Sequence, residues 1–202
     1  MARFDEDCSF PVAFVKRARE KGRITLGVSI DGEDKSYTVS ESFYFSLGSP
    51  RRCDRLSGED IERIREEDET YRALKCALSI LSYADNSQRS LYAKLLKRGF
   101  SSSRARFATE ECVRLGYVRE REQLLRHVEK EANISLFGPK RIVDKLISLG
   151  YSLSEVKEVM AELSASGAVD FEENFKTLCK KKLSPEQMNI ENIRALRYKY
   201  GF

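Results

Sequence analysis

One glycine–aromatic turn occurs three times along this chain at a constant spacing. Gly99-Phe100-Ser101 is followed 51 residues later by Gly150-Tyr151-Ser152, and Gly201-Phe202 follows after another 51 residues. The apolar positions on both sides of the turn keep this offset: Leu91, Leu95 and Leu96 match Ile142, Leu146 and Ile147, while Ala105, Ala108 and Cys112 match Val156, Val159 and Leu163. An offset that holds through two helix-length segments and a turn predicts tandem copies of one structural unit.

The apolar residues around each turn recur every three or four positions, which is the period of an amphipathic helix. We therefore expect three helices in each unit, with the glycine after the middle helix in the left-handed conformation. The expected helices are 71–82, 87–98 and 102–115 in the first unit and 120–132, 139–149 and 153–166 in the second. A third unit is expected to begin with a helix at 171–183 and to start its middle helix at Ser184-Pro185-Glu186-Gln187. Pro139 suits the first turn of a helix, and Ser152 with Glu155 has the spacing of a capping box.

The residues before these units have a different period. Ile24, Leu26, Val28 and Ile30 alternate with polar or small residues, as in a half-buried strand. Asp31-Gly32 then suits a tight hairpin turn, and a second alternating run passes through Val39. We expect one β-hairpin, a short helix at 41–47, and a helix that starts near Ser57 and Asp60 and continues through the acidic residues 61–69.

The expected fold class is therefore mainly α, with tandem three-helix repeats preceded by a small N-terminal β-hairpin region. The expected parts are residues 1–69, with the hairpin and a linking helix, 70–118 as repeat 1, 119–169 as repeat 2, and 170–202 as repeat 3. Two of the repeats are expected to be complete, and the third to lack its last helix.

The composition indicates a soluble protein. The chain has 202 residues, of which 41% are hydrophobic and 34% charged, enough for one sizeable domain or two small ones. Its longest apolar stretches are too short to span a bilayer, and the acidic N-terminus does not resemble a signal peptide. We expect a monomeric, cytoplasmic protein without a membrane partner.

No motif of a metal site, cofactor site or enzyme occurs in the sequence. Five cysteines are scattered without a C-x-x-C pair, which predicts neither zinc nor disulfides: Cys8, Cys53, Cys76, Cys112 and Cys179. The last three are expected to pack as small hydrophobes. The single histidine, His127, lies on an expected helix without a nucleophile beside it, and we interpret it as a surface residue. There is no glycine-rich phosphate loop, so we expect a protein that is not an enzyme and holds no metal or cofactor.

Basic residues concentrate in the second part of the chain. Residues 70–202 carry 24 basic and 16 acidic residues, and the charge recurs at matching positions of the units, because Lys94 matches Lys145 and Arg106 matches Lys157. Stacked units would place these residues along one side, as a surface that neutralises phosphates without reading bases. The alternative interpretation is an ordinary solvated helix face. The candidate contacts to nucleic acid or to a nucleoprotein filament are Arg89, Lys94, Lys97, Arg98, Arg104, Arg106, Lys140, Arg141, Lys145, Lys157, Lys181, Lys182, Arg194 and Arg197.

A charge reversal tests this surface. Lys94→Glu combined with Lys145→Glu is expected to weaken binding with little loss of melting temperature.

Among the aromatic residues, Phe100, Tyr117, Tyr151 and Phe171 lie beside turn glycines and are expected in the core. The candidates for stacking on bases are Tyr92, Tyr198 and Tyr200.

The order of these segments resembles the RecX family. ALSILSYADNSQRSLYAKLLKRGFSSSRARFATEECVRLGYV is similar to the first RecX repeat, and FGPKRIVDKLISLGYSLSEVKEVMAEL to the second. RITLGVSIDGEDKSYTVSESFYFSLG is similar to the hairpin and helix that precede the repeats in many members, so the resemblance covers roughly residues 23–202. Two features depart from the family pattern: Arg119-Glu120 stands where an acidic pair is frequent, and the third repeat is expected to lack its last helix.

The resemblance implies a regulatory role in homologous recombination, DNA repair and the SOS response. RecX proteins bind the RecA recombinase, lodge in the groove of the RecA–DNA filament, and block its extension, strand exchange and ATP hydrolysis. They also bind single- and double-stranded DNA directly. Two alternatives remain at this stage: a helix-turn-helix DNA-binding regulator, because two helices joined by a glycine turn superficially fit that motif, and a repeat scaffold with a purely protein partner.

Overall fold

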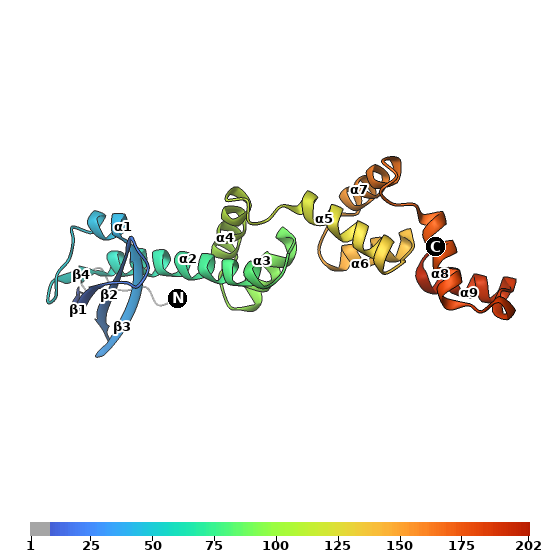
Figure 1. The fold of residues 1–202 in the computed structure, drawn as a ribbon. Helices are drawn as coiled ribbons and strands as arrows, with labels where there is room; N and C mark the ends of the chain where they lie inside the picture. The colour runs from blue at the N-terminus through green and yellow to red at the C-terminus, as the bar shows by residue number, and fades with distance from the viewer. Residues whose placement is uncertain (1–8) are drawn as a thin grey trace. The chain divides into compact units, whose positions relative to one another are not determined.

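The computed structural model describes residues 9–202, which are mainly helical with a small N-terminal antiparallel sheet (Figure 1). The sheet consists of β1 (Ser9–Arg17), β2 (Arg23–Ile30), β3 (Glu33–Ser40) and β4 (Arg55–Ser57) in the order β3-β2-β1-β4. Cys8 and the acidic N-terminus of the sequence lie outside the described residues.

The predicted hairpin and the helix after it are confirmed. β2 and β3 pair with Ile24 opposite Val39, and Asp31 and Gly32 both have positive φ in the turn. α1 (Glu41–Ser46) follows, with Ser40 as its N-cap. The alternating residues of β2 are buried against the side chains of α2, since Leu26, Val28, Ile61 and Ile64 belong to one cluster. β1 and β4 were not predicted, and they supply the additional strands that a lone hairpin needs for stability.

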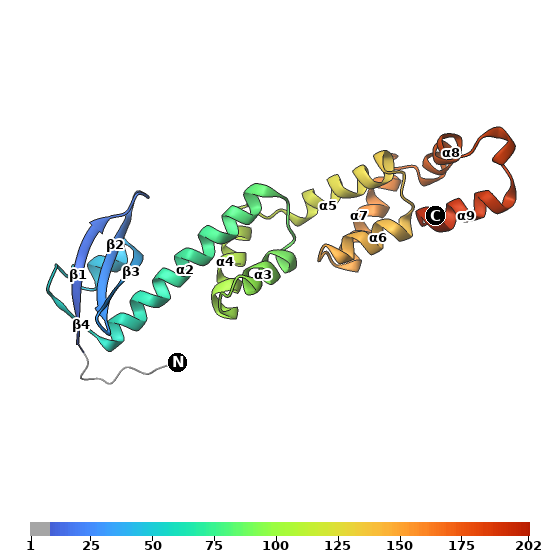
Figure 2. The same ribbon diagram turned by 90° about the horizontal axis from the view of Figure 1, so that it is seen from below.

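The remaining elements are helices (Figure 2). Most of their bounds lie close to those expected. They are α2 (Gly58–Tyr83), α3 (Gln88–Lys97), α4 (Ser102–Arg114), α5 (Glu120–Glu129), α6 (Pro139–Ser148), α7 (Leu153–Ala165), α8 (Phe171–Lys182) and α9 (Ile190–Tyr200). Gly99, Gly150 and Gly201, at the ends of α3, α6 and α9, all have positive φ, as the left-handed caps require. None of the described helices combines the length and apolar composition needed to cross a bilayer.

Three local predictions differ from the structure. The helix expected at 120–132 ends as α5 at Glu129, and a π-helix, η1 (Lys130–Ile134), continues it. The expected middle helix of the third unit does not start at Ser184, because Pro185–Gln187 form a separate 3-10 turn (η2) and α9 begins after the Asn189 cap. Ser152 accepts from the Glu155 N–H as predicted, but its hydroxyl also donates to the Glu155 carboxylate, in place of the return bond to backbone in a capping box.

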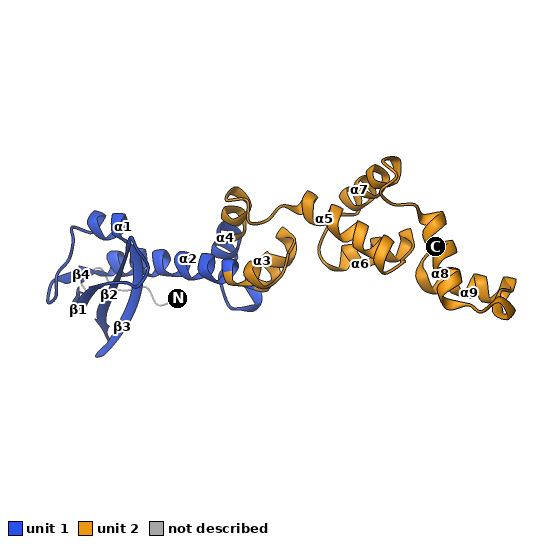
Figure 3. Ribbon diagram, in the orientation of Figure 1, with its two compact units in different colours: residues 1–78, 95–108 blue, residues 79–94, 109–202 orange. Residues whose placement is uncertain are grey.

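The chain divides into two compact units, one of residues 1–78 and 95–108 and the other of residues 79–94 and 109–202 (Figure 3). In the second unit, α5, α6 and α7 enclose one core cluster that includes Leu124, Ile142, Leu146 and Val156. A further cluster of the same unit joins Leu136 to residues of α8 and α9. The surfaces around these two clusters carry the residues described next.

Candidate functional site

Two helix-end contacts hold successive segments of the second unit together. In the first contact, the Ser87 hydroxyl, at the start of α3, donates to the Leu149 carbonyl at the end of α6 (2.8 Å). In the second, the Gly138 N–H, at the start of α6, donates to the Tyr200 carbonyl at the end of α9 (2.8 Å), and the Lys140 N–H donates to Gly201 (3.1 Å). The last carbonyls of one helix thereby satisfy donors at the first turn of another.

The two contacts use matching positions of the sequence. Gly138 lies 51 residues after Ser87, and Tyr200 lies 51 residues after Leu149. In both contacts the glycine after the docked helix end has no room for a side chain. A Cβ on Gly150 would lie 2.6 Å from the Ser87 hydroxyl oxygen, and one on Gly201 would lie 2.6 Å from Arg141.

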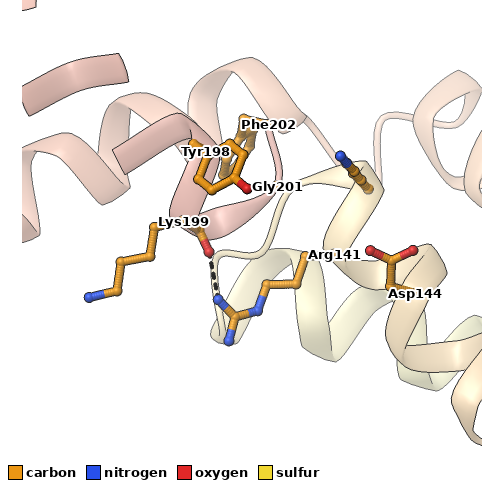
Figure 4. A pocket seen from close by; sticks show the side chains of 7 residues that line it. Arg141, Asp144, Tyr198, Lys199, Gly201 and Phe202 are labelled. Carbon is orange, nitrogen blue, oxygen red and sulfur yellow. Dashed lines mark hydrogen bonds between the residues drawn. The ribbon is translucent and has the colours of Figure 1, made fainter. Parts of the chain in front are cut away.

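A basic pocket of about 380 Å³ lies at the second contact (Figure 4). Lys140 and Arg141 of α6 line it together with Lys199 and the terminal Phe202, and Asp144 is its one acidic residue. The Arg141 guanidinium donates to the Lys199 carbonyl (2.6 Å) and lies 4.2 Å from the centre of the Phe137 ring. Arg141 is therefore held by the protein, whereas Lys140 and Lys199 form no ion pair within the described residues. This pocket suits an anionic group such as a phosphate.

Tyr198 also lines the pocket and is 88% exposed. Tyr200 is partly buried, with its ring centre 6.1 Å from that of Phe137. Of the aromatic residues expected in the core, Tyr151 is buried and Phe171 packs against the core of the second unit. Tyr117 is 56% exposed, so its expected burial is wrong, and the buried residue after Gly116 is Val118.

The matched lysines Lys94 and Lys145 both bind buried polar side chains. Lys145 Nζ lies 2.7 Å from Glu131 Oε1, and the Glu131 side chain is only 5% exposed. Its second oxygen, Oε2, is buried with no hydrogen-bond partner among the described residues. Lys94 donates to the side-chain oxygen of Asn86, which is also buried. The ammonium groups of both lysines are thus already bound by side chains of the protein.

Two other candidate residues, Arg104 and Arg98, bind side chains of the first unit. The Arg104 guanidinium is half-buried and pairs with Glu66 of α2 (3.1 Å), and Arg98 donates to the Cys76 sulfur (3.0 Å). The remaining candidates are exposed and form no ion pair within the part of the chain that the structure describes: Arg89, Lys97, Arg106, Lys157, Lys181, Lys182, Arg194 and Arg197. Of these, Arg197 lies over the Phe175 ring (4.8 Å).

His127 is half-buried, so its interpretation as a surface residue is corrected. Its ring centre lies 6.0 Å from that of Tyr151, and burial lowers the pKa of its imidazole. Tyr151 donates to Gln123 (3.0 Å), and burial raises the pKa of its hydroxyl to about 12. Tyr151 belongs to the core cluster of the second unit, so His127 and Gln123, which contact it, contribute to packing.

The predicted packing of cysteines holds for two of the three. Cys112 and Cys179 are buried, and burial is the main cause that raises the pKa of the Cys112 thiol. Cys76 is half-buried beside Arg98. No cluster of three or more potential metal ligands occurs among residues 9–202.

Sequence comparison finds curated relatives that share one name. The Regulatory protein RecX of Lactobacillus johnsonii is 27% identical over 151 residues, which cover 74% of this chain and 54% of the relative. The Regulatory protein RecX of Lactobacillus gasseri is 25% identical over 158 residues, which cover 77% of this chain and 56% of the relative. The chain therefore spans about half the length of the curated relatives it matches. No protein-family model matches the chain.

The described residues define a mainly helical protein with a small N-terminal antiparallel sheet and many exposed basic side chains. A solved structure of the same fold is a crystal structure of regulatory protein RecX, with a TM-score of 0.68 at 16% identity, over 96% of this chain and 94% of that one. The similarity in sequence to the curated proteins, together with this likeness in fold, confirms the resemblance to the RecX family.

Proposed function

We propose that the chain regulates the RecA recombinase by binding the RecA–DNA filament. The observation that carries this proposal is the similarity in sequence to proteins named Regulatory protein RecX, which the likeness in fold supports. The expected effect is inhibition of filament extension, strand exchange and RecA ATP hydrolysis. The role needs no catalytic group of its own, since the hydrolysis belongs to RecA.

A modular body would suit this role. We propose that residues 70–118 and 119–169 are successive three-helix units, that residues 170–202 supply two helices of a third, and that residues 1–69 precede them as a separate part. The 51-residue recurrence, the glycine caps and the two matching helix-end contacts support this division. Several weak contacts from linked units add up as avidity along an extended partner.

The exposed basic residues are proposed to contact DNA phosphates, within the filament or directly. In the second unit these are the pocket residues Lys140 and Lys199, with Lys181 and Lys182 at the end of α8. Ammonium groups that neutralise phosphates release counterions, so binding should be largely independent of sequence and should weaken steeply with salt. Lys94, Lys145 and Arg104 are expected to contribute less, because their charges already have partners inside the protein.

A titration of RecA's DNA-dependent ATP hydrolysis tests the proposal. Substoichiometric protein should slow hydrolysis, and Lys181→Glu with Lys182→Glu should need more protein for the same effect. Lys21→Glu is the matched control, because Lys21 is an exposed lysine in the turn between β1 and β2. An unchanged ATPase rate at a large excess of protein would reject RecA regulation. Equal potency of the double variant and the control would remove the α8 lysines from the site.

The helix-turn-helix alternative gains little from the structure. The second helix of such a motif in the second unit would be α7, and its exposed residues include Glu155, Glu158 and Glu162. Glu158 and Glu162 also pair with Arg121 of α5, so this face offers few free cations to the phosphates that border the major groove. In a competition experiment at fixed salt we expect bulk DNA to displace any duplex equally well; strong preference for one sequence would favour the alternative.

A further inference from the structure

Within residues 9–202, the two helix-end contacts described above leave one glycine turn and one helix start without a partner of this kind. Of the three glycine turns, those at Gly150 and Gly201 are docked, whereas nothing within the described residues approaches a Cβ placed on Gly99 within 4 Å. Of the three matching helix starts, those at Ser87 and Gly138 are docked. The third is Asn189, the N-cap of α9, and Ile190 beside it is 69% exposed.

We propose that the Gly99 turn of one copy of this protein docks on the start of α9 of a second copy. The partner is a second copy because this chain itself carries the complementary glycine turn. Turns of the same kind dock on helix starts twice within the second unit. The contact would repeat the geometry of the Ser87–Leu149 and Gly138–Tyr200 contacts, with Asn189 in the place of Ser87 and Gly138. The Arg98 carbonyl would then take the place of the Leu149 and Tyr200 carbonyls.

The charges at the two free ends favour this contact. Lys140 and Lys199 line the pocket at the second contact, and the residues at the matching positions of the free ends are Glu191 and Lys97. Both side chains are exposed, and neither forms an ion pair within residues 9–202. Docking would therefore bring an acidic and a basic side chain together, where the contact within the chain has two lysines.

The hydrogen-bonding groups are also available. The Asn189 side-chain oxygen accepts from the Asn192 N–H (2.9 Å) and caps α9, and the Asn189 amide nitrogen donates to no group within residues 9–202. At the first contact the Ser87 oxygen likewise accepts from Ser90 (3.2 Å) while its hydroxyl donates to Leu149. An end-to-end contact of this kind joins two different surfaces, so it generates open chains of molecules or rings. Because it is small, it should be weak and depend on high local concentration.

A charge-exchange experiment tests the proposal by analytical ultracentrifugation of the full chain. The wild-type weight-average mass should rise with concentration. Glu191→Lys and Lys97→Glu should each weaken association at least about tenfold, because each places like charges together. An equimolar mixture of the two variants should recover association, because opposite charges then meet at both kinds of junction.

Two further variants separate docking from general charge effects. Gly99→Asn tolerates the left-handed conformation but adds a Cβ where the docked glycines have none, so it should stay monomeric. Lys21→Glu should associate as the wild type does. Circular dichroism and the melting temperature check that each variant is folded. A wild-type protein that remains monomeric up to about 1 mM would overturn the proposal, and so would a mixture that fails to associate when the wild type does.

Discussion

Replacing Lys145 should destabilise the protein, because its ammonium group is the partner of a buried carboxylate. Lys145 Nζ lies 2.7 Å from Glu131 Oε1, and Glu131 Oε2 has no partner among the described residues. Loss of one member of a fully buried ion pair costs about 3–5 kcal/mol. Lys145 is 44% exposed, so water replaces part of the lost interaction, and we expect about 1–3 kcal/mol for Lys145→Met.

Urea denaturation followed by circular dichroism measures this loss as a shift of the midpoint. The matched control is Lys157→Met, because Lys157 is exposed on α7 without an ion pair in the described part of the chain, and its replacement should change stability by less than about 0.5 kcal/mol. Glu131→Gln should reduce the effect of Lys145→Met, since the buried charge is then absent. If Lys145→Met shifts the midpoint no more than Lys157→Met does, the pair contributes nothing to stability and the reasoning is refuted.

This result also changes the meaning of a charge reversal at Lys145. The sequence predicts that Lys94→Glu with Lys145→Glu weakens binding with little loss of melting temperature. In the structure, Lys145→Glu places a second carboxylate beside the buried Glu131, so we now expect a marked fall in melting temperature. Lys140 and Lys199 are better positions for testing DNA contacts, because their ammonium groups have no such partner within the described residues.

Three further predictions concern buried groups of the second unit. Burial lowers the pKa of His127, so the unfolded chain binds a proton more readily than the folded one. The free energy of unfolding should therefore be highest above about pH 6.5 and fall below it. His127→Gln should flatten this fall, measured by urea titrations at several pH values. A profile that His127→Gln leaves unchanged would contradict this. Gly138→Ala should lower the free energy of unfolding by about 1–3 kcal/mol, because the new Cβ would lie 2.4 Å from the Gly201 backbone. Hydrogen exchange of the Lys140 amide should become faster, and an unchanged rate would show that the contact adapts. Tyr151→Phe should cost about 1–2 kcal/mol, since Gln123 loses its donor. In alkaline absorbance titrations the variant should lose absorbance near pH 12, and a loss near pH 10 instead would exclude that assignment.

Local sequence patterns predicted most of the helical part of the fold. Amphipathic spacing located α3, α4, α6 and α7 within one or two residues, and the glycines located their ends, because both are properties of a single segment. β4 has only three residues and β1 is stabilised by its pairing with β2 and β4, so neither has a strong pattern of its own. The π-helix after α5 also depends on tertiary packing, since Glu131 is buried in it against Lys145 of α6.

The candidate site was predictable only as a distribution of charge. Recurrence along the chain drew attention to Lys94, Lys140 and Lys145 together, and nothing in their local sequence distinguishes them. The structure separates them, because Lys94 and Lys145 have buried partners on other segments while Lys140 lines an open pocket. Whether a lysine is free for a phosphate depends on the polar side chains that pack beside it, such as Asn86 and Glu131, and the charge pattern does not identify these residues.

The length of RecA filaments on single-stranded DNA tests the central claim most directly. Electron microscopy of filaments assembled with cognate RecA, with and without substoichiometric amounts of this protein, measures extension itself. Regulation at the filament predicts shorter filaments in the presence of the protein, and a weaker effect for Lys181→Glu with Lys182→Glu than for Lys21→Glu. Filaments of unchanged length at a large excess of the protein would contradict the account.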